Sequence, residues 1–118
     1  MADLKAQETT VEGRSTVIVS GQLTINTAPE LRSVLMKYVK RRRASLLLDL
    51  SGVEFMDTSG LATLIEAHLQ AERNRGTLVL FGLRPRIADV FKVTRVTSLF
   101  KILDTQEAAL EALKGDGQ

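Results

Sequence analysis

Residues 46–62 read LLLDLSGVEFMDTSGLA, and the rest of the chain is interpreted outward from them. The apolar run at 45–50 is typical of a strand buried on both faces of a sheet, and this strand is expected to run out through the Ser-Gly pair at 51–52. The polar turn at 57–60 then presents Ser59 where an amphipathic helix is expected to begin. A helix N-terminus has unpaired N–H groups and a partial positive charge, so it tolerates an added phosphate. Ser59 is therefore a good position for a charge switch.

Strands and helices alternate on both sides of this turn. We expect strands at 16–20 and 77–81, a short strand or extended segment at 99–102, and a hairpin partner at 8–11 joined through the turn at 12–13. The expected helices follow Thr27, the 57–60 turn, Pro85 and Asp104. This alternation predicts an α/β fold with a mixed, mostly parallel sheet of four to five strands and crossover helices packed largely on one face.

Several local signals place the ends of these helices. Thr27 with Glu30, and Asp104 with Glu107, have the spacing of capping boxes, and Pro29 suits a first turn. Glycines are plausible helix stops at 76 and 115. The second helix is expected to bury one stripe: Leu61, Leu64, Ile65, His68 and Leu69.

Composition sets the broad class of protein. A chain of 118 residues without internal repeats is expected to be one domain, 1–118, with a core of about 7–114 and short flexible termini. There is no cysteine, which removes disulfides and thiolate sites. The sequence shows no apolar run long enough to span a bilayer and no signal-peptide pattern, so we expect a cytoplasmic protein.

The sequence offers little for catalysis, so we do not expect an enzyme, a metal site or a cofactor. The one histidine, His68, falls on an apolar helical stripe nine residues after Ser59, where a packed histidine is the favoured interpretation. Phosphate-binding glycine motifs are absent. The basic cluster at 37–43 has two interpretations: a patch that binds nucleic acid or an acidic partner, and the solvated C-terminal end of a helix. We favour the helix end.

Local physics leaves two questions open around the central turn. One of Asp57 and Ser59 either simply caps the N-terminus of the helix or has a functional role. Capping is the favoured interpretation. Phe55 and Met56 are core residues or form an apolar lip beside the serine, on which a partner could dock.

Three segments, in order, then carry a resemblance: GQLT at 21–24 with TAPEL at 27–31; LDLSGV at 48–53 with FMDTSGL at 55–61; and LFGL at 80–83 leading into Pro85 and Phe91. The run 17–113 resembles a STAS domain, the fold shared by anti-sigma factor antagonists and the cytoplasmic tails of sulfate transporters. The middle segment is the specific one.

The resemblance implies a protein-binding switch. In the family, the serine before the motif glycine is phosphorylated by a partner kinase, an anti-sigma factor with an ATPase-type fold. That position is Ser59, with Thr58 as a secondary candidate. Docking on this anti-sigma factor serine kinase would release a sigma factor, and a phosphatase would reset the switch. The expected partner-binding residues are Gly21, Thr24, Asp57, Thr58, Ser59, Gly60 and Leu61.

One departure and two alternatives accompany this resemblance. The family's first loop often ends in Asp, and Thr24 stands at that position. Some small relatives instead bind the ATPase subunit of an ABC lipid transporter, often without the serine, and others are scaffold subunits of large assemblies. No direct contact with nucleic acid and no membrane span are expected, and dimerisation stays open.

Overall fold

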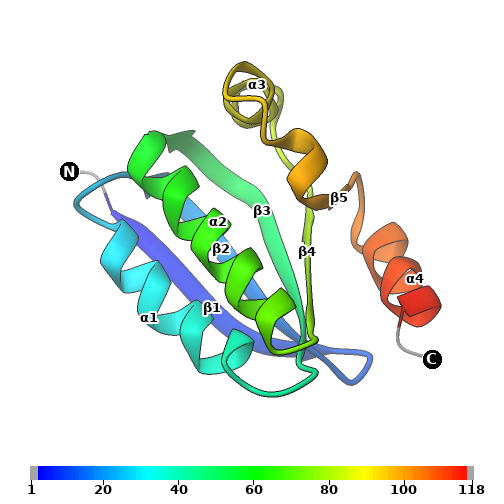
Figure 1. Ribbon diagram of the computed structural model, residues 1–118. Coiled ribbons are helices and arrows are strands. Elements are labelled where there is room, and N and C mark those ends of the chain that lie inside the picture. The colour runs from blue at the N-terminus through cyan, green and yellow to red at the C-terminus, as the bar shows by residue number, and fades with distance from the viewer. Residues whose placement is uncertain (1–2, 117–118) are drawn as a thin grey trace.

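The computed structural model describes residues 3–116, which form one five-stranded sheet and four α-helices (Figure 1). The strand order is β1-β2-β3-β4-β5; β1 runs antiparallel to β2, and every other neighbouring pair is parallel. The predicted α/β class and mostly parallel sheet are confirmed. The elements in chain order are β1 (Leu4–Val11), β2 (Arg14–Leu23), α1 (Ala28–Val39), β3 (Ser45–Met56), α2 (Thr58–Arg73), β4 (Thr77–Phe81), α3 (Pro85–Val93), a 3₁₀ turn η1 (Thr97–Leu99), β5 (Lys101–Leu103) and α4 (Gln106–Asp116).

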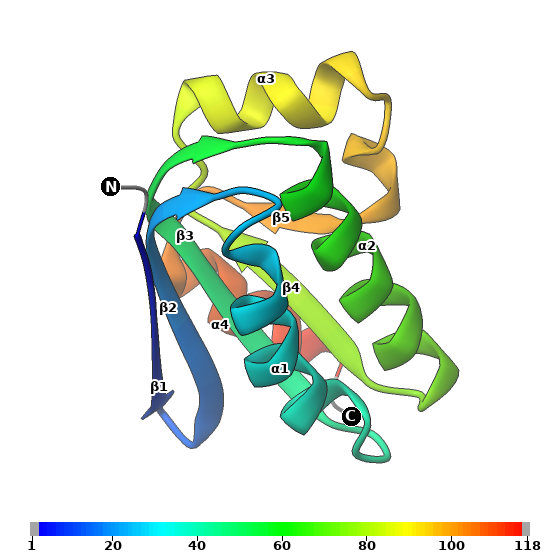
Figure 2. The same cartoon turned by 90° about the vertical axis from the view of Figure 1, so that its left-hand side faces the viewer.

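The helices divide between the two faces of the sheet (Figure 2). α1 and α2 pack on one face over an aliphatic core that includes Leu31, Leu48 and Leu64, all fully buried. α4 covers the opposite face, where Leu113 packs in a smaller cluster with Leu47 of β3 and with Val79 and Phe81 of β4. The expectation that helices lie largely on one face therefore holds for α1 and α2, whereas α4 lies behind the sheet.

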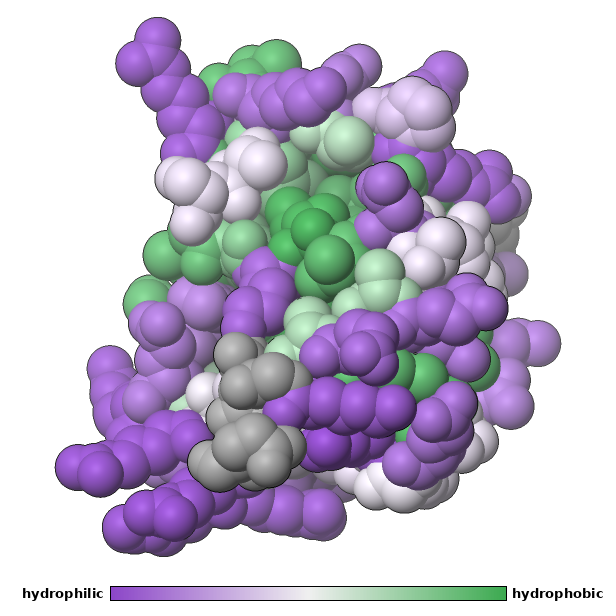
Figure 3. Space-filling model, turned by 90° about the vertical axis from the view of Figure 1, so that its right-hand side faces the viewer, coloured by the Kyte–Doolittle hydropathy of each residue, from purple (hydrophilic) through white to green (hydrophobic). Residues whose placement is uncertain are grey.

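α3 lies across the end of the sheet and buries Ile87 and Phe91 in the larger core. Between α3 and β5 is a hollow of about 240 Å³, lined in part by Leu83 and Ile102. Figure 3 looks at this side of the molecule, and apolar side chains gather in the middle of the view. No helix within residues 3–116 is long and apolar enough to cross a membrane.

β3 is twice as long as the predicted strand at 45–50 and continues to Met56. Its pairing with β2 shifts register twice, between Ile18 and Ser20 and between Gly21 and Gln22. Each shift places an extra β3 residue opposite β2, as in a β-bulge. The bulges keep Leu50, Val53 and Met56 buried in the same core although they are three residues apart. The polar turn predicted at 57–60 is therefore reduced to Asp57, and α2 begins at Thr58.

Three predicted details of the helix starts and faces are wrong. Thr27 precedes α1 but makes no capping bond; its hydroxyl donates to Gln22 O at 2.7 Å instead. Thr105, not Asp104, caps α4, because its hydroxyl accepts the Ala108 N–H at 3.1 Å. Leu69 is 46% exposed, because the buried face of α2 turns toward Thr63, Ala67 and Ala71.

Two predicted helix stops also differ. α2 ends at Arg73, and the left-handed residue after it is Arg75, with φ of 61°, rather than Gly76. Gly115 lies within α4, which extends to Asp116. The rest of the tail predicted as flexible, residues 117–118, and the first two residues lie outside the described part of the chain.

Candidate functional site

Asp57 connects the start of α2 to the loop between β2 and α1. Its Oδ1 accepts the Gly60 N–H at 3.0 Å, which makes Asp57 the N-cap of α2. Its Oδ2 accepts the Ile25 N–H at 3.1 Å, and its own N–H donates to Leu23 O at 3.1 Å. Figures 1 and 2 both show this loop beside the first turn of α2. One carboxylate thus fixes two segments that are 32 residues apart in sequence.

Ser59 is half-buried in the first turn of α2, and Thr58 beside it is exposed. An α-helix leaves its first N–H groups without intrahelical acceptors. In α2 the N–H groups of Asp57 and Gly60 have partners, whereas among the described hydrogen bonds those of Thr58 and Ser59 have none. The position therefore combines a partly accessible hydroxyl with a free, positively polarised helix end.

Gly60 and Leu61 lie below this surface. Both are buried, and Leu61 is only 4% exposed as part of the larger core. A Cβ on Gly60 would meet Leu23 Cγ at 2.5 Å and Leu23 O at 2.8 Å. The motif glycine therefore permits the close approach of α2 to β2, and these two residues offer a docking partner little surface.

Gly21 and Thr24 shape the neighbouring loop. Gly21 has φ of +98°, and a Cβ there would lie 2.2 Å from Asp3 O, so a side chain would collide with the start of β1. The Thr24 hydroxyl accepts the Asn26 N–H at 3.2 Å, and Thr24 O accepts the N–H groups of Thr27 and Ala28. Thr24 thus supports the turn into α1, and its half-buried side chain stays close to the loop.

Exposed apolar side chains surround this end of the molecule. Met56 is buried in the core, whereas Phe55 is 43% exposed, so Met56 is a core residue and the apolar lip stays a prediction for Phe55. Ile25 is 68% exposed and was not expected at this surface from the sequence. Its signal was a single large apolar residue among Thr24, Asn26 and Thr27, but only the bond to Asp57 places it beside α2.

The outer face of α2 continues this surface. A shallow hollow of about 340 Å³ is lined there by Ala62, Ile65, Leu69 and neighbouring polar residues. At its rim Arg32 of α1 donates to Glu66 of α2, with the shortest N–O distance 2.6 Å. The hydrogen bonds from Arg32 lower the pKa of the Glu66 carboxyl. This pair joins the two helices and leaves the apolar centre of the face uncovered.

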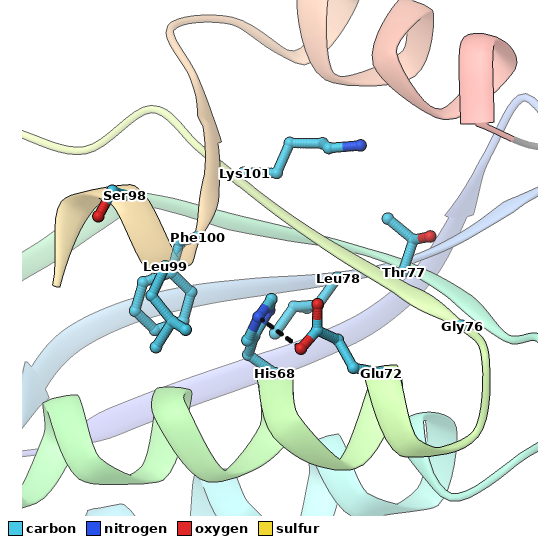
Figure 4. A pocket seen from close by; sticks show the side chains of 9 residues that line it. All are labelled: His68, Glu72, Gly76, Thr77, Leu78, Ser98, Leu99, Phe100 and Lys101. Atoms are coloured by element: carbon cyan, nitrogen blue, oxygen red, sulfur yellow. Dashed lines mark ion pairs between the residues drawn. The ribbon is translucent and has the colours of Figure 1, made fainter.

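His68 lies in a different place, shown in Figure 4. It lines a hollow of about 430 Å³ between α2 and the η1–β5 segment, with its ring edge-on to Phe100 at 5.4 Å between centroids. Its Nε2 is 3.5 Å from a Glu72 oxygen, and its buried Nδ1 has no hydrogen-bond partner among the described residues. Nine residues along a helix correspond to about 13 Å, so His68 is not positioned to activate Ser59. The side chains described, those of residues 3–114, also include no cluster of three suited to a metal ion.

The chain is similar in sequence and in fold to proteins of one known family. Residues 5–109 match the family model described as "STAS domain". The anti-sigma-B factor antagonist of Listeria monocytogenes is 29% identical over 90 residues, covering 76% of this chain and 79% of that protein. Its counterpart from Staphylococcus aureus is 27% identical over 105 residues, covering 89% and 97%. The crystal structure of an anti-sigma factor antagonist from Mycobacterium paratuberculosis superposes with a TM-score of 0.83 at 25% identity, covering 95% of both chains. The chain belongs to the STAS domain family.

Proposed function

We propose that this chain is an anti-sigma factor antagonist whose binding to an anti-sigma factor serine kinase is switched off by phosphorylation of Ser59. The observation that carries the proposal is the half-buried Ser59 in the first turn of α2, next to exposed apolar side chains. The names of the relatives from Listeria and Staphylococcus support the class of function. The chain supplies the acceptor hydroxyl, and the kinase supplies ATP and the catalytic groups, which implies a cytoplasmic location.

A phosphate on Ser59 is compatible with the fold. The free N–H groups of Thr58 and Ser59 can donate to phosphate oxygens, and the helix N-terminus favours negative charge. Asp57 keeps its bonds to Gly60 and Ile25, so the cap and the loop contact need not change. The modified protein should therefore remain folded.

The same phosphate would oppose docking. It adds about −1.5 to −2 charges at a surface that already carries the Asp57 carboxylate. It also places a hydrated group at the end of the molecule that exposes Ile25 and Phe55, two apolar side chains available to a partner. A hundredfold loss of affinity requires only about 2.8 kcal/mol, which one such desolvated charge can supply.

The test is affinity capture from the host's lysate with four tagged proteins: wild type, Ser59→Ala, Ser59→Asp and Ser98→Asp. Ser98 is an exposed serine in η1, so the last variant is a charge-matched control away from the first turn of α2. We expect a kinase-like ATPase with wild type and Ser98→Asp, and its loss with Ser59→Asp. Incubating the captured partner with ATP should phosphorylate wild type at Ser59, with Thr58 as the secondary site, and leave Ser59→Ala largely unmodified.

Two results would contradict the proposal. One is undiminished capture of the kinase by Ser59→Asp. The other is capture of the ATPase of an ABC lipid transporter by all four proteins, which would assign the chain to a transport complex and leave Ser59 as part of a helix terminus.

A further inference from the structure

A group of positively charged side chains lies at the end of the sheet opposite to Ser59. The β1–β2 turn and the loop between α1 and β3 meet around a hollow of about 350 Å³. We call it the arginine cleft, because Arg14, Arg41, Arg42 and Arg43 line it together with Tyr38. Figures 1 and 2 show both segments at one end of the molecule, with the first turn of α2 at the other.

The loop that carries three of these arginines is held in place by Asn74. The Asn74 side-chain amide donates to Val39 O at 2.9 Å, and the Asn74 backbone carbonyl accepts the Arg43 N–H at 2.8 Å. Arg43 has φ of 57°, a left-handed conformation that a non-glycine residue adopts only where the surroundings favour it. The loop is therefore anchored to the ends of both α1 and α2, and the arginines are presented from a fixed backbone.

These guanidinium groups form no ion pair within the described part of the chain, although the charge of Arg41 makes a small contribution at the Glu8 carboxylate. Elsewhere Arg32 pairs with Glu66 and Lys37 with Glu8, but no carboxylate of residues 3–114 forms an ion pair with the four cleft arginines. Glu8 accepts hydrogen bonds from Lys37 and Tyr38, and these bonds lower its pKa.

Two further groups complete the description of the cleft. Glu12 is the carboxylate in the β1–β2 turn beside Gly13, and it is exposed. Arg41 lies over the Tyr38 ring, with its Cζ 5.2 Å from the ring centroid. The cleft is thus a concave site with an excess of positive charge.

We propose that the arginine cleft binds a small anion that carries two or more phosphate groups. The planar fork of a guanidinium matches phosphate oxygens in bidentate geometry, and several forks around one hollow favour closely spaced phosphates over a single carboxylate. The volume falls within the range of small-ligand sites. β3 runs between the two ends of the molecule, so the cleft lies roughly 30 Å from Ser59. Ligand and kinase can therefore bind together, and the proposal does not depend on the phosphorylation switch.

The test is calorimetric titration of the full chain with sodium tripolyphosphate at low ionic strength, with citrate as a tricarboxylate comparison. The cleft variant Arg14→Gln/Arg42→Gln takes one arginine from each segment. The control Arg86→Gln/Arg95→Gln removes the same charge from an exposed arginine of α3 and from an exposed arginine two residues after its end. Amide NMR shifts of the unmodified protein provide a readout that does not depend on any variant, and thermal melting verifies that each variant is folded.

We expect one tripolyphosphate per chain, weaker binding of citrate, and weakening by added salt. The cleft variant should lose roughly tenfold affinity or more for each guanidinium removed, while the control stays within about twofold. Shifted amides should cluster at residues 13–15 and 41–45.

Three results would overturn the proposal: no binding of tripolyphosphate, equal losses in the two double variants, or shifted amides around Ser59 instead. Parallel titrations with anionic vesicles and duplex DNA identify the source of the phosphates. Binding to vesicles or DNA without binding to tripolyphosphate would also refute a small-anion site.

Discussion

Asp57 joins two elements through its two carboxylate oxygens, and substitution can separate these contacts. Asp57→Ala removes the N-cap bond to Gly60 and the bond to Ile25. Loss of an N-cap costs about 1 kcal/mol, and loss of a hydrogen bond at a half-exposed charged acceptor costs about 1 kcal/mol more. We therefore expect Asp57→Ala to lower the free energy of unfolding by about 2 kcal/mol.

The variant Asp57→Ser separates the two contributions to this loss of unfolding free energy. A serine hydroxyl can still cap the Gly60 N–H, but it has no second oxygen for the Ile25 N–H. We expect a loss of about 1 kcal/mol, half of that in Asp57→Ala. The matched control is Thr105→Ala, which removes the cap of α4 and leaves the β2–α1 loop untouched.

The assay combines urea unfolding with hydrogen exchange at single amides. The Ile25 amide should exchange faster in Asp57→Ser and Asp57→Ala than in wild type, and at the wild-type rate in Thr105→Ala. Unchanged Ile25 exchange in Asp57→Ser, or a loss below about 0.5 kcal/mol in Asp57→Ala, would refute the view that this carboxylate holds the loop.

The other predictions concern packing, pH and the switch position. Gly60→Ala should lower the free energy of unfolding by about 1–3 kcal/mol in urea titration, because collision with buried Leu23 outweighs the gain of up to about 1 kcal/mol in helix propensity; a stabilised variant would contradict the close contact. The Glu8 pKa lies below its ordinary value of 4.5, chiefly through the Lys37 hydrogen bond, so between these two values the unfolded chain binds more protons. Stability should therefore be lost as pH falls through that window, and Glu8→Gln should flatten the profile; an identical profile in the variant would count against the contact. Ser59→Asp should melt at or slightly above the wild-type temperature, since an acidic residue in the first turn gains about 0.3–1 kcal/mol; marked destabilisation would show that the helix end cannot accept the charge.

Local patterns in the sequence were sufficient for most of the fold. The strand predicted at 77–81 matches β4, and the turn at Glu12 and Gly13 joins β1 to β2 as expected. These features depend on residues close together in the chain, whose apolar periodicity and turn chemistry act without distant partners. The DTSG motif likewise placed Ser59 at the start of a helix, because capping is a local interaction.

The remaining features depend on contacts between distant segments. The bulges that carry β3 on to Met56 come from its register with β2, and the position of α4 behind the sheet comes from packing against Leu47 and Val79. The bond from Ile25 to Asp57 joins residues 32 apart in sequence. A local pattern shows which side chains need a partner, but only the folded backbone determines which partner comes within reach. For the same reason, the basic cluster at 37–43 is visible in the sequence, but the arginine cleft is not. The cleft forms because the fold brings Arg14 beside this cluster.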